Sequence, residues 1–136
     1  MNNTIKVNCT KKNLKLIRDF ITEYLNSYAL SDILLNQIVL AVDEICANLI
    51  IHANQEDPSK FITLQIEKVK NSIKFEIADN GVAFNQNKYQ EPDIEEHIRI
   101  GKKGGVGIAL VNRIMDSVEF KTVKGQNICY LSKQIS

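Results

Sequence analysis

Residues 31–53, SDILLNQIVLAVDEICANLIIHA, contain no glycine or proline and carry apolar side chains at a helical spacing. Leu34, Ile38, Ala41 and Ile45 recur three or four positions apart, which places them on one face of a helix. Ser31 stands just before this pattern and is a favoured N-cap residue. The stretch predicts an amphipathic helix of about six turns that needs a second layer to cover its apolar face.

The residues before this helix predict a strand and a second helix. Residues 4–9 alternate weakly between apolar and polar side chains, which is typical of an edge strand. Thr10 is an expected N-cap for a helix over about 11–28. Its apolar face comprises Leu14, Ile17, Ile21, Tyr24 and Leu25.

The residues after the central helix predict two hairpins separated by a third helix. Residues 60–67 and 72–78 alternate with period two around Lys70 and Asn71, which indicates an antiparallel hairpin. A helical pattern follows the glycines at 101, 104, 105 and 107, and strands near 118–123 and 127–133 complete the chain. We expect one α+β domain over 1–136, a two-layer sandwich with helices on one face of a mostly antiparallel sheet.

Composition restricts the class of function. The 136 residues are 44% hydrophobic and 24% charged with a formal net charge of +1, which gives no indication of a nucleic acid or anionic membrane partner. No signal-peptide pattern is present, and no segment is expected to span a membrane. Cys9, Cys46 and Cys129 are odd in number and widely spaced, which favours reduced thiols and a cytoplasmic location.

Three polar segments are candidates for a functional site, and the first lies on the central helix. Glu44, Asn48 and His52 are spaced i, i+4 and i+8, so they are expected to share a face. An acid, an amide and an imidazole there could supply a proton acceptor, an oxygen ligand for Mg²⁺ and an orienting group. Taken alone, the same spacing also fits an ordinary polar helix edge.

The second segment is Asp79-Asn80-Gly81, at the end of a predicted buried strand. Such a triplet is most often a turn. Here apolar residues continue through Phe84, and a long polar segment follows in place of a return strand. A carboxylate at a buried strand end suits an exocyclic amine such as that of adenine.

The third segment is glycine-rich and opens the last predicted helix. Residues 101–107, GKKGGVG, would direct unhindered backbone N–H groups and the positive end of a helix dipole toward a phosphate. The pattern is neither a P-loop nor a dinucleotide fingerprint, and a simple flexible loop also fits it. The polar residues from about 85 to 103 are expected to form a functional lid.

Taken together and in order, DEICANLIIHA (43–53), DNGVAF (79–84) and GGVGIALVNRIMD (104–116) resemble the N, G1 and G2 boxes of the GHKL ATPases. Within that superfamily the chain resembles the stand-alone anti-sigma-factor serine/threonine kinases of bacterial partner-switching systems. The resemblance implies the Bergerat fold, an α+β sandwich with a mostly antiparallel, mixed sheet and helices on one face.

The resemblance also implies roles for individual residues. Glu44 would be the general base, Asn48 the protein ligand of Mg²⁺, and Asp79 the reader of the adenine amine. Lys103 stands where many relatives carry an arginine that contacts the γ-phosphate, and lysine offers a point charge in place of a planar fork. The other implied ATP-binding residues are Gly81, Phe84, Lys102, Gly104, Gly105, Val106 and Gly107.

By the same resemblance, ATP and Mg²⁺ would serve to phosphorylate a STAS-domain anti-sigma-factor antagonist. A sigma factor would be the alternative partner, and the chain would form a homodimer. Three other readings remain open: a nucleotide-dependent binding regulator without catalysis, an orphan histidine-kinase-like ATPase domain, and an α+β domain with no nucleotide site.

Overall fold

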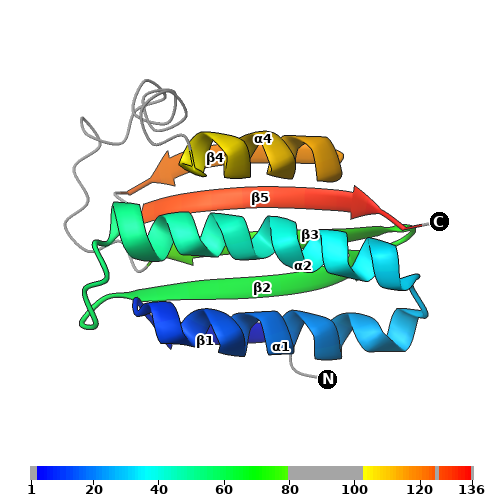
Figure 1. The fold of residues 1–136 in the computed structure, drawn as a ribbon, viewed down its shortest axis with the longest axis horizontal. Helices are drawn as coiled ribbons and strands as arrows, with labels where there is room; N and C mark the ends of the chain where they lie inside the picture. Colours follow the sequence, from blue (N-terminus) through cyan, green and yellow to red (C-terminus); the bar gives the residue numbers. More distant parts are fainter. Residues whose placement is uncertain (1–2, 80–102, 125, 136) are drawn as a thin grey trace.

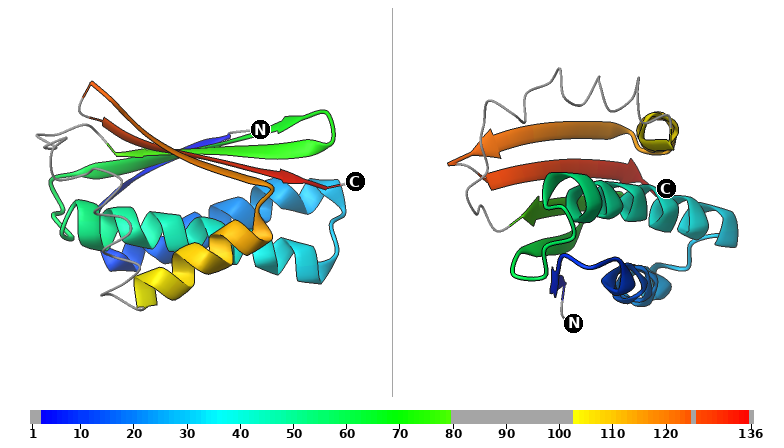
Figure 2. Two further views of the ribbon diagram at one scale, coloured as in Figure 1. Left: turned by 90° about the horizontal axis from the view of Figure 1, so that it is seen from above. Right: turned by 60° about the vertical axis from the view of Figure 1, so that its left-hand side comes forward.

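The structure, a computed structural model, describes residues 3–79, 103–124 and 126–135. A five-stranded sheet forms one layer and three α-helices cover one of its faces, as seen from above in Figure 2. The two-layer α+β prediction is therefore confirmed. The elements are β1 (Thr4–Asn8), α1 (Leu14–Leu25), α2 (Asp32–Ala47), β2 (Phe61–Val69), β3 (Ser72–Asp79), α4 (Lys103–Ile114), β4 (Ser117–Val123) and β5 (Gln126–Gln134).

The strand order is β1-β2-β3-β5-β4, and every described pair of neighbours is antiparallel. The expectation of a mixed sheet is wrong in this respect. Both predicted hairpins form, with Val69 opposite Ser72 and Val123 opposite Gln126. Lys70 in the first turn has a φ of 57°, the left-handed conformation that tight hairpin turns require.

Helix α2 runs through the centre of the helical layer. Ser31 caps it as predicted, because its Oγ accepts the Leu34 N–H at 3.1 Å. The α-helix ends at Ala47, however, and Asn48–Ala53 form a π-helix, so the predicted six-turn α-helix is wrong in its last part. Buried Asn54 terminates this segment by donating its N–H and its side-chain Nδ2–H to the Leu49 carbonyl, at 2.9 and 2.8 Å.

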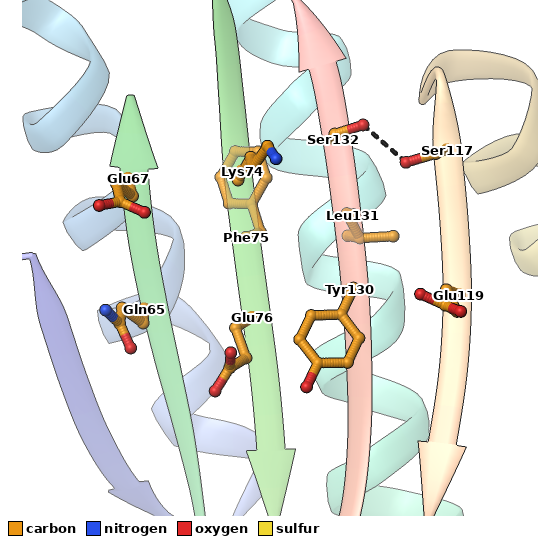
Figure 3. Close-up of a pocket in the computed structure, with 10 residues that line it drawn as sticks. All are labelled: Gln65, Glu67, Lys74, Phe75, Glu76, Ser117, Glu119, Tyr130, Leu131 and Ser132. Atoms are coloured by element: carbon orange, nitrogen blue, oxygen red, sulfur yellow. Dashed lines mark hydrogen bonds between the residues drawn. The ribbon is translucent and has the colours of Figure 1, made fainter. Parts of the chain in front are cut away.

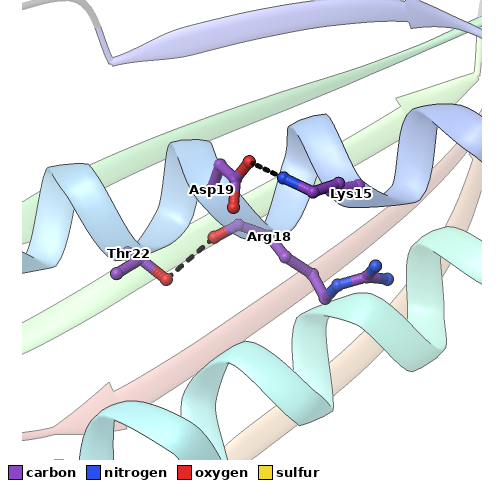
Figure 4. Close-up of polar contacts among 4 residues, drawn as sticks. All are labelled: Lys15, Arg18, Asp19 and Thr22. Atoms are coloured by element: carbon purple, nitrogen blue, oxygen red, sulfur yellow. Dashed lines mark hydrogen bonds and ion pairs between the residues drawn. The ribbon is translucent and has the colours of Figure 1, made fainter.

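Helix α1 is flanked by 3₁₀ turns at Lys11–Asn13 and Asn26–Tyr28, which together span the predicted range. Thr10 does not cap it through its side chain, since only its carbonyl accepts the Asn13 N–H. Lys15 pairs with Asp19 at 3.0 Å on the exposed surface (Figure 4). Arg18 turns toward α2 instead, where its Nη1 lies 3.1 Å from Asp43 Oδ1.

The core lies between the sheet and the helices. It includes Phe75 on β3, Ile21 on α1 and Ile38 on α2, each at most 1% exposed. A window of Asp32–Ala53 has a mean hydropathy of 1.7, so this one stretch among the described residues is long and apolar enough, by length and composition only, to cross a membrane. Its packing against the sheet and both other helices is that of a core helix, which meets the same criteria.

The three cysteines are free of disulfides, as the sequence predicted, and all three are buried. Burial raises the pKa of the Cys129 thiol to about 12. Burial, and secondarily the charge of Asp79, raises the pKa of Cys9 to about 11. Because the thiolate is the reactive form, these side chains act as small hydrophobic residues of the core.

Candidate functional site

Three segments distant in sequence meet at one end of the sandwich. The C-terminal end of α2, the last residue of β3 and the N-terminal end of α4 lie on the left in Figure 1. Pairing of Ile62 with Asp79 fixes the end of β3 beside the start of β2, which follows α2 through the π-helix Asn48–Ala53 and a loop over 54–60. The topology therefore brings together the helix with Glu44, the strand with Asp79 and the helix that begins at Lys103.

Asp79 is the buried carboxylate of this end, with 2% of its surface exposed. Its Oδ1 accepts the Asn127 N–H at 3.1 Å and its Oδ2 accepts the Asn127 side-chain Nδ2–H at 2.6 Å. The Asp79 main-chain oxygen accepts a hydrogen bond from Gln126 Nε2 at 2.6 Å. These contacts hold the carboxylate in one orientation.

Neither Asn127 nor Gln126 was a candidate from the sequence. Both open β5, which pairs with β3 so that Ala78 lies opposite Ile128. Asn127, the residue before Ile128, reaches the Asp79 carboxylate through its two hydrogen bonds. One feature of the sequence could have indicated Asn127: it is a polar residue at an inward-facing position of a buried strand. Without the strand order, that signal pointed to no partner.

Glu44 is half-buried near the end of α2, where we predicted a general base. Burial raises its pKa above the ordinary value of 4.5, and the charge of neighbouring Asp43 adds to this rise. The Arg18 guanidinium lies against Asp43 at 3.1 Å and so partly offsets the effect of that carboxylate. A carboxylate with a raised pKa is a stronger proton acceptor than an exposed one.

Asn48 lies one turn beyond Glu44. Its N–H donates to the carbonyls of Glu44 and Ile45, so the expected i, i+4 relation between Glu44 and Asn48 holds. That relation does not extend to His52, because the π-helix from Asn48 onward turns through a smaller angle per residue. The side chain of His52 is exposed.

Helix α4 begins at Lys103, which confirms that the glycine-rich segment opens a helix. The first four N–H groups of an α-helix have no acceptor within the helix, and here they belong to residues 103–106. Gly104, Gly105 and Gly107 therefore lie within the first turns of α4. Gly81, Phe84, Lys102 and the rest of the predicted lid, 85–102, lie outside the described residues.

The open face of the sheet carries a separate groove of about 400 Å³, shown in Figure 3. Glu67, Lys74, Glu76, Glu119 and Tyr130 are among its lining residues. These side chains point away from the helices, and the groove includes none of the predicted site residues.

Comparison with known proteins agrees with this architecture. The family model described as a histidine kinase-like ATPase domain matches residues 7–133. The chain belongs to this family. In this histidine kinase-like ATPase domain, the candidate site lies where α2 and β3 end and α4 begins.

Among individual relatives, the chain is 29% identical over 93 residues to the serine-protein kinase RsbW of Bacillus mycoides and 28% identical to that of Bacillus thuringiensis. Each match covers 65% of this chain and 58% of the relative. Among solved structures, the RsbU and RsbW domains of a Mycobacterium tuberculosis protein match 98% of this chain and 33% of that chain. The TM-score is 0.64 and the identity 11%, a likeness of fold. A histidine kinase domain from Erythrobacter litoralis gives a TM-score of 0.53 at 14% identity, over 75% of this chain and 45% of that chain.

The side chains available as metal ligands determine whether this domain could hold Mg²⁺. Among the described residues, no group of three or more His, Cys, Asp or Glu side chains is placed to hold a metal. Mg²⁺ at nucleotide sites uses one or two protein ligands together with phosphate oxygens and waters. A single half-buried amide oxygen at Asn48 fits that type of site.

We expect Glu44→Gln to stabilise the fold at neutral and alkaline pH. The folded state holds the Glu44 proton more tightly than the unfolded chain, so the stability that Glu44 contributes is full below pH 4.5 and is lost as the pH rises through its raised folded-state pKa. Thermal unfolding at a series of pH values should show a higher Tm for the variant at pH 8, with the difference vanishing in acid. A Tm difference that is the same at every pH would contradict the assigned cause.

Proposed function

We propose that this domain is an ATP-dependent protein kinase that transfers a phosphoryl group to a serine or threonine of a STAS-domain anti-sigma-factor antagonist. Membership of the histidine kinase-like ATPase family and similarity to RsbW serine-protein kinases support this proposal. One observation carries it: Glu44, a half-buried carboxylate with a raised pKa, lies near the end of α2, and α2 packs against both α4 and β3, the strand that ends at buried Asp79.

Some residues at this end would bind the nucleotide, and others would take part in phosphoryl transfer. Asp79 would accept a hydrogen bond from the adenine amine, while the N–H groups that open α4 would bind phosphate oxygens. Asn48 would hold Mg²⁺, which supplies neutralisation of phosphate charge when bound. Lys103 would place its ammonium near the γ-phosphate.

Transfer would require one proton acceptor. The substrate hydroxyl oxygen forms a bond to the γ-phosphorus as the bond from that phosphorus to the β,γ-bridging oxygen breaks, and ADP leaves with the electron pair. The hydroxyl proton passes to Glu44. This step gives a function to a carboxylate that burial makes costly to keep ionised.

A sigma factor would be the second partner, held when the antagonist is phosphorylated, and the kinase would act as a homodimer in the cytoplasm. The chain spans 58% of the length of the curated relatives that it matches. These partner assignments therefore rest on resemblance, and the nucleotide site rests on the residues described above.

Nucleotide binding is the first claim to test. At about 100 times its dissociation constant, Mg-ATP should stabilise the domain by about 2.7 kcal/mol, because it binds the folded state alone. Differential scanning fluorimetry with Mg-ATP, Mg-ADP and Mg²⁺ alone measures this, and the two nucleotides should raise the Tm where Mg²⁺ alone does not. An unchanged Tm with both nucleotides at millimolar concentration would refute the proposal.

A further inference from the structure

Asn127 makes an unusual pair of contacts with Asp79. It donates to both carboxylate oxygens, from its main-chain N–H to Oδ1 at 3.1 Å and from its side-chain amide to Oδ2 at 2.6 Å. Both residues are almost fully buried, at 1% and 2% exposure. Two donors from one residue, one to each oxygen, define the plane of a carboxylate as well as its position.

The orientation of the Asn127 amide is itself fixed. Its Oδ1 faces Thr122 Oγ1 at 3.4 Å across the β4–β5 pair, which leaves Nδ2 directed at Asp79. The main-chain donor is held by the register between β3 and β5. The two contacts from Asn127 to Asp79 therefore depend on three neighbouring strands, β3, β5 and β4.

We propose that Asn127 is the positioning residue that sets base selectivity at this site, by holding the Asp79 carboxylate in the plane in which it meets the exocyclic amine of adenine. This proposal rests on the proposed nucleotide function. A carboxylate accepts hydrogen bonds near its own plane, and the two donors of Asn127 fix that plane. The plane of the carboxylate decides the direction from which the amine of a base can approach.

Selectivity follows from the chemistry of the base edge. Adenine presents an amine donor at the position where guanine presents a carbonyl oxygen. An oriented carboxylate accepts from the amine and repels the carbonyl, whereas a carboxylate free to rotate discriminates less between them. Loss of the Asn127 amide should therefore reduce the preference for ATP over GTP, beyond any loss of stability.

The test compares variants of nearly the same shape. Asn127→Val removes the side-chain donor, and Asn127→Thr has the same branched shape with one hydroxyl donor. We expect Asn127→Val to lower the ratio of ATP to GTP affinity by about tenfold, with Asn127→Thr between it and the wild type. Isothermal titration calorimetry with Mg-ATP and Mg-GTP, below the Tm of each variant, measures both affinities.

A substitution that only destabilises the fold should lower the Tm without changing the ATP-to-GTP affinity ratio. Leu131→Ala, on the same strand and buried, should lower the Tm while leaving the ATP-to-GTP ratio unchanged. If Asn127→Val does not fold, Asn127→Ala also lacks the donor and decides the matter. An unchanged ratio in a variant without the donor overturns the proposal for Asn127, while a wild type that binds neither nucleotide refutes the proposed function itself.

Discussion

Glu44→Gln is expected to reduce phosphoryl transfer from ATP to a serine-bearing STAS-domain partner by about 10²–10⁴-fold, the usual contribution of a general base. The amide of glutamine keeps the size and polarity of the side chain but cannot accept the hydroxyl proton. ATP affinity should remain that of the wild type, because Glu44 is assigned to the transfer step and not to nucleotide binding. Transfer of label from γ-labelled ATP measures the first quantity, and calorimetry measures the second.

A matched control removes the same charge elsewhere. Glu23 lies exposed on α1, so Glu23→Gln should leave both transfer and ATP affinity unchanged. Transfer by Glu44→Gln at the wild-type rate would exclude Glu44 as the base. Binding of ATP without transfer by the wild type, with a range of STAS partners, would favour the alternative of a nucleotide-dependent binding regulator.

Glu44 is expected to affect both catalytic activity and stability. Burial and Asp43 raise the pKa of Glu44, which makes its ionised form a better base and also makes that form unfavourable in the folded state. Glu44→Gln should therefore lose transfer and gain stability at neutral pH. Opposite changes of this kind are typical of residues kept for function.

Local patterns explain how much of the fold could be predicted. Ser31 and the apolar spacing of α2 depend on residues within a few positions of each other, and both were identified correctly. The π-helix at Asn48–Ala53 was missed because its sequence continues an α-helical pattern. Its termination depends on the buried side chain of Asn54, and the burial of a side chain is a tertiary property.

In the candidate site, contacts between residues close in sequence could be predicted, and contacts between distant residues could not. Glu44 and Asn48 are one turn apart, so their proximity follows from the sequence alone. Asp79 and Asn127 are 48 positions apart and meet because β5 pairs with β3. Strand order of this kind depends on how whole elements pack, which is why the sequence indicated the carboxylate and not the residue that holds it.

Asp79→Asn is expected to weaken ATP binding by about 10- to 100-fold. The variant loses a hydrogen bond from the adenine amine to a charged acceptor, a contribution of about 1.5–3 kcal/mol. It also places an amide against the two donors of Asn127. Both donors then lose a charged acceptor, and the one that faces the new NH₂ loses its acceptor altogether, so the Tm should fall. Calorimetry with Mg-ATP below the Tm separates weaker binding from loss of the fold.

Asp79→Asn should affect ATP and GTP affinity differently. An amide at position 79 can turn its NH₂ toward the carbonyl oxygen of guanine, so Asp79→Asn should lose affinity for ATP and not for GTP. Glu76→Gln is the matched control, because Glu76 lies on the same strand but points to the open face of the sheet in Figure 3. Equal ATP affinity in Asp79→Asn and the wild type would remove Asp79 from the base-binding site, since no other effect of the substitution restores the lost charge.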